Sequence, residues 1–327
     1  MKYKQLKKLN VEILNKLLVD YIEYKQATGV KYDSEYKSIK YFIKYCKSIY
    51  KDSTIDENAI FEWINSFLNT SLKTKCNYIG ALRGFAVYLY SLGYIQFNIP
   101  NVRTPRSTAF MPYIFNDAEL NKIWEIVDNI KEYKHFPNLN KCIPVFFRLL
   151  YSSGLRVTEA LSIVKKDIDF EKNVILLKKT KLSKERYIPL SKSMSKILKK
   201  YVDMLNVSSS DYIFYFVKGT KLTRDDIYRR FKMALKSAQI HYKGKLNGPR
   251  VHDFRHTFSV KSMDCMVDSG VDIYVSLPIL SAYLGHTNVK STEKYIRMTK
   301  ERMHIVTESM ESVLNNILPE VKTYEEI

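Results

Sequence analysis

The sequence predicts a mainly α-helical protein of two domains, with one small antiparallel β-sheet in the second domain. Three observations lead to this prediction. Apolar residues recur at helical spacing along most of the chain, they alternate only near residues 173–190, and prolines interrupt the helices near residue 100. With 327 residues, of which 46% are hydrophobic and 13% aromatic, the chain is long enough to form two separate cores.

The chain is strongly basic, with 53 Lys and Arg against 34 Asp and Glu and a formal net charge of +19. Both the first 106 residues and the remainder carry an excess of basic residues, so the charge is not confined to one tail. A polyanion such as nucleic acid is therefore the natural partner. The alternative is a lysine-rich surface that reflects an AT-rich genome and needs no such partner.

Four cysteines lie far apart and form no CxxC pair, which argues against a zinc site or a disulfide framework. The N-terminus lacks the apolar core of a signal peptide. No apolar run approaches the roughly 18 residues of a membrane span. The sequence therefore predicts a cytoplasmic protein with no membrane segment and no metal site.

The first domain is predicted over residues 1–98 as four helices without an intervening strand. Four segments have apolar residues at every third or fourth position: 9–28, 33–50, 56–67 and 72–93. Their aromatic side chains are interpreted as core residues rather than platforms for stacking bases. Polar positions of the fourth segment are the candidates for contact with a nucleic acid: Lys73, Lys75, Asn77 and Arg83.

Residues 99–113 are predicted to form a linker, because they contain three prolines together with Arg103 and Arg106. An extended basic connection would let two domains close around a DNA duplex as a clamp, with both arginines as candidate DNA contacts. An ordinary surface connection is the alternative and needs no DNA. The positive charge on both sides of the linker favours the clamp.

The second domain is predicted over residues 114–327, beginning with a helix that Asn116 caps. A strongly apolar helix over 142–151 should be central to its core. Residues 173–177 and 186–190 are predicted to be antiparallel strands joined by a basic hairpin tip. Further helices are predicted over 192–205, 224–238 and 252–267 and from 273 onward.

Two parts of this domain suit the binding of a phosphate. Arg156 follows a Ser-Ser-Gly turn at the start of a predicted helix, where a guanidinium can hold two anionic oxygens at once. Glu159 could fix this arginine or cap the helix. His252 and Arg255 lie three residues apart on a predicted helix and share one face, which suits phosphate binding and proton transfer. An ordinary solvated helix face is the alternative for each pair.

His286 follows a predicted helix end at Gly285, and Tyr295 lies on the next predicted helix. A tyrosine phenol has an unperturbed pKa near 10, so as a nucleophile it needs a base or strong positive charge nearby. The sequence holds 25 tyrosines, and spacing alone does not single out Tyr295. The basic hairpin tip holds lysines that could reach a DNA groove and protonate a leaving oxygen: Lys178, Lys179, Lys181 and Lys184.

In their order along the chain, six residues resemble the catalytic set of the tyrosine recombinase (phage integrase) family: Arg156, Lys181, His252, Arg255, His286 and Tyr295. Four segments carry the resemblance: 153–161, 184–190, 252–258 and 284–295. Alignment of Lys184-Glu-Arg with the family's hairpin pattern selects Lys181, although Thr180 and Leu182 stand where glycines are typical. The front helices and the linker resemble the family's core-binding domain, so the resemblance covers essentially the whole chain.

The resemblance implies a fold and a reaction. The fold would combine a SAM-like four-helix core-binding domain with a catalytic domain of the DNA breaking-rejoining enzyme type. Tyr295 would attack a phosphodiester of double-stranded DNA and become linked to the 3′ phosphate, with neither a cofactor nor a metal. Arg156 and Arg255 would neutralise the charge on the non-bridging oxygens.

The remaining roles follow from the same resemblance. Lys181 would protonate the leaving 5′ oxygen, and Lys178 and Lys179 would contact DNA. His252 would exchange a proton near the nucleophile, and His286 would hydrogen-bond the phosphate. Glu159 would be a supporting residue.

Strand exchange between two duplexes implies a homotetramer on specific inverted-repeat DNA sites. The tail beyond Lys300 has apolar residues at helical spacing and an acidic end, so it is expected to dock on a neighbouring subunit; packing on its own domain is the alternative. The spacer between Arg255 and His286 is longer than in the family, and its extra residues, about 268–277, are expected to form a surface extension.

The sequence does not separate a recombinase of a mobile element from an Xer-like enzyme. Two functions from other classes also remain open. A type IB topoisomerase shares the chemistry but relaxes supercoils without a partner duplex. A DNA-binding regulator with an inactive catalytic domain would lack the chemistry, and the complete set of six residues argues against it.

Overall fold

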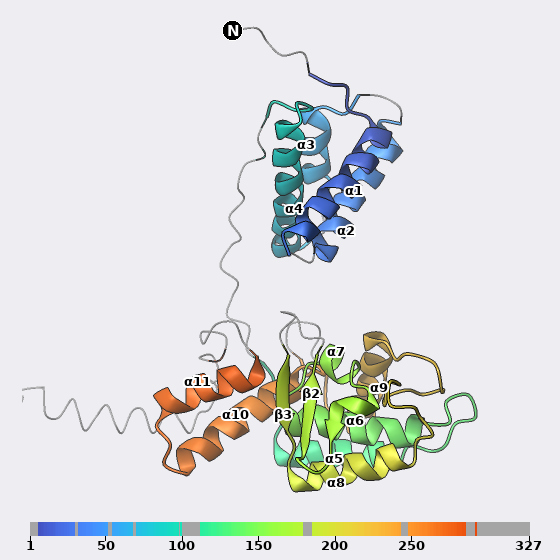
Figure 1. The fold of residues 1–327 in the computed structure, drawn as a ribbon, viewed down its shortest axis with the longest axis vertical. Coiled ribbons are helices and arrows are strands. Elements are labelled where there is room, and N and C mark those ends of the chain that lie inside the picture. Colours follow the sequence, from blue (N-terminus) through green and yellow to red (C-terminus); the bar gives the residue numbers. More distant parts are fainter. Residues whose placement is uncertain are drawn as a thin grey trace, which may run out of the picture. The chain divides into compact units, whose positions relative to one another are not determined.

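The computed structural model describes residues 6–29, 32–51, 54–67, 70–97, 99, 112–178, 185–242, 248–285 and 292. The chain forms two compact units, Met1–Ala109 and Phe110–Ile327. Helices dominate both units, and the strands of the described part form one antiparallel sheet in the second unit (Figure 1). This architecture confirms the predicted fold class. The predicted domain limits at residues 98 and 113 stay predictions, because residues 100–111 lie outside the described ranges.

The first unit contains four helices: α1 (Val11–Ala27), α2 (Asp33–Ile49), α3 (Glu57–Asn65) and α4 (Leu72–Ser91). Three of them begin where the side chain of Asn10, Asp56 or Ser71 accepts a backbone N–H from the first turn. Their apolar faces meet in one core, in which Trp63 and Phe85 are buried. The prediction of a core role is thus confirmed for the buried aromatic residues, whereas Tyr24, Tyr41 and Tyr90 are more than half exposed.

The second unit contains seven α-helices within the described residues, one 3-10 turn and three strands. In chain order they are α5 (Asp117–Asp128), α6 (Leu139–Ser153), α7 (Val157–Ala160), η1 (Lys165–Asp167), β1 (Ile168–Asp169), β2 (Val174–Leu177), β3 (Arg186–Pro189), α8 (Lys192–Asp203), α9 (Arg224–Ser237), α10 (Asp253–Asp268) and α11 (Ile273–Leu284). Helix α6 packs against α5, α8 and α10, and Phe146 and Phe147 on it are fully buried. Its predicted central place in the core is confirmed.

The sheet has the strand order β1-β2-β3, and Ile175 of β2 pairs with Ile188 of β3. Both isoleucine side chains are buried. Tyr187, which precedes Ile188 on β3 and therefore points to the opposite face, is exposed. The two longer strands match the prediction. The short strand β1 was not predicted, because two residues carry too little pattern to be recognised.

Helices α10 and α11 lie side by side and share a small apolar core (Figure 1). The expected surface extension at 268–277 agrees with the exposed and partly exposed residues 268–275, but it is wrong for Ser276 and Leu277, which are buried on α11. The side chain of Tyr274, in the first turn of α11, is 80% exposed. Within the described residues, no helix has the length and apolar composition needed to cross a bilayer.

Candidate active site

Glu159 lies at the centre of the site, buried on the short helix α7. Its Oε2 accepts the backbone N–H of Arg156 at 3.0 Å, and its Oε1 accepts the Nη1 of the same arginine at 2.7 Å. The carboxylate therefore caps the helix and fixes the arginine at once, which are the two alternatives that the sequence offered. The Arg156 side chain remains 24% exposed.

A second arginine binds the same carboxylate. Arg186, the first residue of β3, donates from Nη1 to Oε1 of Glu159 at 3.2 Å and from Nη2 to Oε2 at 2.9 Å. Burial alone would raise the pKa of Glu159, but the hydrogen bonds from Arg186 and from the Arg156 backbone outweigh it and hold the pKa below its usual value. The carboxylate is thus kept ionised between two guanidinium groups.

Arg186 was missed as a site residue, although the sequence contained a signal for it. In a strand, side chains alternate between the two faces, so Arg186 lies on the same face as the buried Ile188. A guanidinium on the core face of a strand requires a carboxylate partner nearby. The partner, Glu159, is remote in sequence, and spacing could not identify it.

Arg255 on α10 joins three segments that are distant in the sequence. Its side chain is 1% exposed, and it donates from Nη1 to the carbonyl of Gly154 and from Nη2 to the carbonyl of Leu284, both at 2.7 Å. Its Nη1 also lies 4.0 Å from Oε2 of Glu159. Gly154 is required here for two reasons: its φ is +59°, and a Cβ there would lie 2.4 Å from a ring carbon of Phe258, which packs against this turn.

His252 occupies the position before the first turn of α10, and its ring meets that of His256 edge-on, with 4.8 Å between the ring centroids. The turn that precedes it is fixed by Asp253, which is fully buried and accepts the backbone N–H of Arg250 at 2.6 Å. Burial raises the pKa of Asp253, and the bonds from Arg250 offset part of that effect. His252 and Arg255 therefore come from the same rigidly held end of one helix.

Three of the predicted catalytic residues, Lys181, His286 and Tyr295, lie outside the described residues. The structure describes the chain up to Gly285, which ends α11 with a φ of +64°, so the predicted helix end is confirmed. Gly285 precedes His286 and directly follows Leu284, whose carbonyl accepts a hydrogen bond from Arg255.

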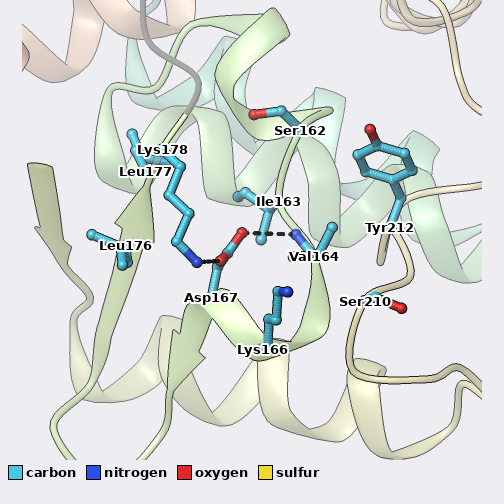
Figure 2. A pocket seen from close by; sticks show the side chains of 10 residues that line it. All are labelled: Ser162, Ile163, Val164, Lys166, Asp167, Leu176, Leu177, Lys178, Ser210 and Tyr212. Carbon is cyan, nitrogen blue, oxygen red and sulfur yellow. Dashed lines mark hydrogen bonds and ion pairs between the residues drawn. The ribbon is translucent and has the colours of Figure 1, made fainter. Parts of the chain in front are cut away.

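Lys178 is the last described residue before the hairpin tip, and its side chain turns toward Asp167 (Figure 2). Its Nζ lies 2.6 Å from Oδ1 of Asp167, whose Oδ2 accepts the backbone N–H of Val164 at 3.3 Å. The hydrogen bond to Asp167 raises the pKa of Lys178 against the opposing effect of burial. These residues line a cavity of about 320 Å³, and the ion pair anchors the base of the hairpin at its edge.

The other candidates for DNA contact are spread over the chain. On α4, Lys73 and Asn77 are exposed, and Lys75 and Arg83 are half-buried. Arg103, Arg106 and Lys179 lie outside the described residues. The role of all these residues in DNA binding stays a prediction.

The α-rich second unit thus holds a buried carboxylate, that of Glu159, between the guanidinium groups of Arg156 and Arg186. A family model described as the phage integrase family matches residues 115–302. The tyrosine recombinase XerC of Rickettsia rickettsii is 25% identical over 303 residues, which are 89% of this chain and 92% of that protein. The chain belongs to the phage integrase family, and its activity is that of a site-specific tyrosine recombinase.

Solved structures show the same fold. The Tn1549 transposon integrase, in complex with a circular intermediate DNA, aligns with a TM-score of 0.63 at 17% identity, over 91% of this chain and 99% of that chain. The XerH recombinase bound to a palindromic difH substrate aligns with a TM-score of 0.61 at 24% identity, over 84% of this chain and 77% of that chain.

Proposed function

We propose that this recombinase cleaves and rejoins double-stranded DNA through a 3′-phosphotyrosine intermediate at Tyr295. The observation that carries the proposal is the place of Arg255. Its guanidinium binds the carbonyls of Gly154 and Leu284, each at 2.7 Å. One carbonyl lies two residues before Arg156 and the other two residues before His286, so a single buried arginine ties the two motifs to α10.

The charges of this cluster suit a phosphodiester. Three guanidinium groups, those of Arg156, Arg186 and Arg255, lie within 4.0 Å of the single carboxylate of Glu159, so positive charge is in excess. Positive charge held in place before reaction stabilises the additional negative charge of a phosphoryl-transfer transition state. It also favours the phenolate form of a nearby tyrosine. Arg156 and Arg255 are the proposed phosphate ligands, with His286 as a further hydrogen-bond donor.

The proton donor for the leaving 5′ oxygen is proposed to be Lys181 rather than Lys178. A general acid works best with a pKa near the operating pH, and the bond to Asp167 moves the pKa of Lys178 in the opposite direction. That bond also holds the Lys178 ammonium at the base of the hairpin rather than at its tip. His252 is the proposed group that exchanges a proton with Tyr295.

Lys181→Ala is expected to slow DNA cleavage by about 100-fold or more while DNA binding is retained, because general acid catalysis contributes on this scale. A 5′-sulfur at the scissile position leaves without protonation, so most of the defect should vanish on that DNA. Lys172→Ala is the matched control, because the Lys172 side chain is 80% exposed in the turn before β2, and it should behave like wild type on both substrates. If Lys178→Ala or Lys179→Ala is the variant that sulfur rescues, the assignment of Lys181 is wrong.

The proposed substrate is an inverted-repeat DNA site held by a tetramer, with the C-terminal tail of each subunit docked on its neighbour. The two solved neighbours are complexes with DNA, one of them with a palindromic substrate, and the net charge of +19 favours a polyanion.

DNA that the protein protects and covalently joins is expected to contain a short inverted repeat when it is recovered from a genomic library and sequenced. A supercoiled plasmid with two copies of that site should then yield recombinant circles. A type IB topoisomerase would instead relax the plasmid and leave its sequence unchanged. Relaxation without any recombinant product would therefore contradict the proposed function.

A further inference from the structure

Arg186 binds the buried carboxylate of Glu159 through both terminal nitrogens. Its Nη1 and Nη2 each donate to a different oxygen of Glu159, at 3.2 and 2.9 Å, and its side chain is 15% exposed. Such a two-pronged pair fixes the plane of the carboxylate as well as its position. The last torsion of a glutamate side chain is broad, so its own rotamer preference would leave that plane poorly defined.

The orientation of this carboxylate decides where the Arg156 side chain lies. Oε1 of Glu159 accepts Nη1 of Arg156 at 2.7 Å, in addition to Nη1 of Arg186. A rotation of the carboxylate would therefore carry the Arg156 guanidinium with it. Arg156 is the proposed phosphate ligand, so the Arg186 pair controls the direction in which that ligand points.

The same guanidinium lies against the residue that precedes His286. A Cβ placed on Gly285 would be 2.9 Å from Nη1 of Arg186 and 3.1 Å from its Cζ. Arg186 also begins β3, directly after the hairpin that holds Lys181. Arg186 therefore contacts the segment of Arg156 through Glu159, and the segment of His286 at Gly285. In sequence it also follows the hairpin that carries Lys181.

We propose that Arg186 is a positioning residue for DNA cleavage, which acts through Glu159 to direct Arg156 at the scissile phosphate. This inference rests on the proposed function. A buried ion pair is weak evidence for a role in stability, because well-packed apolar residues often replace such pairs without loss of stability. In addition, Nε of Arg186 is buried and makes no hydrogen bond to the part of the chain that the structure describes.

The test compares cleavage of two nicked suicide substrates, one with the natural phosphodiester and one with a methylphosphonate at the scissile position. The methyl group replaces a charged oxygen, so Arg156 has less charge to neutralise there. Arg186→Ala is expected to be about 100-fold slower than wild type on the phosphodiester, because a displacement of a catalytic group on the scale of 1 Å costs this much. On the methylphosphonate its defect should shrink to less than about 10-fold.

Two further variants separate positioning from folding. Arg148→Ala is the matched control, because Arg148 makes an equally two-pronged pair with Asp128, at 2.7 Å from each nitrogen, and it should cleave both substrates like wild type. Arg186→Lys keeps the charge but not the fork. It should show the same selective loss on the phosphodiester, and it serves if the alanine variant does not fold.

The variant Arg156→Ala/Arg186→Ala is expected to be no slower than Arg156→Ala alone, because Arg186 acts through Arg156. Equal defects on the two substrates, or losses that add in the double variant, would overturn the positioning role. Absence of a covalent complex with wild-type protein on both substrates would refute the proposed function and this inference with it.

Discussion

Tyr295→Phe is expected to abolish the covalent protein–DNA complex on a nicked suicide substrate and to leave the mobility shift of the same DNA unchanged. Phenylalanine keeps the ring but lacks the oxygen that would bond to phosphorus. No other group in the proposed mechanism can take over that bond, so the loss should be complete rather than partial. The measurement is the amount of protein that remains bound to DNA after denaturation.

Tyr274→Phe is the matched control for this variant. Tyr274 lies on α11 of the same domain and is 80% exposed, so removal of its hydroxyl should change neither folding nor cleavage. Continued covalent trapping by Tyr295→Phe would assign the nucleophile to another residue. A regulator with an inactive catalytic domain would trap no DNA even as wild type.

Glu159→Gln is expected to lower the free energy of unfolding by about 3–5 kcal/mol at neutral pH, because it removes the shared partner of buried guanidinium groups. The amide of glutamine has one oxygen acceptor and one NH₂ donor. Its NH₂ group would face the N–H groups of an arginine, so Arg156 would lose its fixed position as well. DNA cleavage should fall with it. Asp128→Asn is the control, since it breaks a partly exposed pair with Arg148 and should cost about 1 kcal/mol or less.

The difference in the free energy of unfolding between wild type and Glu159→Gln is expected to be larger at neutral pH than at acidic pH. The pKa of Glu159 is lowered in the folded protein, since hydrogen bonds from Arg186 and Arg156 outweigh the opposing effect of burial. Its stabilising contribution is therefore fully present above the unfolded pKa of about 4.3 and is lost as the pH falls through the lower folded value. Denaturant unfolding at neutral and acidic pH measures the difference, and a pH-independent difference would contradict this account.

Much of the fold could be predicted because its signals are local. Helices with an apolar stripe and a capping residue, such as the one that Asn116 opens, are encoded within a few turns of sequence. The stop at Gly285 is equally local, since the residue has a positive φ. The burial of Leu277 was harder to predict, because it arises from the packing of α11 against α10, which local sequence signals do not constrain.

The site was predictable only in part for a related reason. Arg156, Glu159 and Arg255 lie together, but nothing in their spacing reveals that Glu159 also binds Arg186, 27 positions further along the chain. The hairpin lysines show the same limit. Spacing alone does not choose among them, and the ion pair with Asp167 that holds Lys178 at the base of the hairpin could not be read from the sequence.

The central claim is tested most directly by locating the covalent bond itself. Wild-type protein is trapped on a nicked suicide substrate and digested, and the peptide that carries the nucleotide is identified by mass spectrometry. We predict that this peptide contains Tyr295, linked to a 3′ phosphate. A nucleotide found on any other tyrosine, or linked through a 5′ phosphate, would contradict the account.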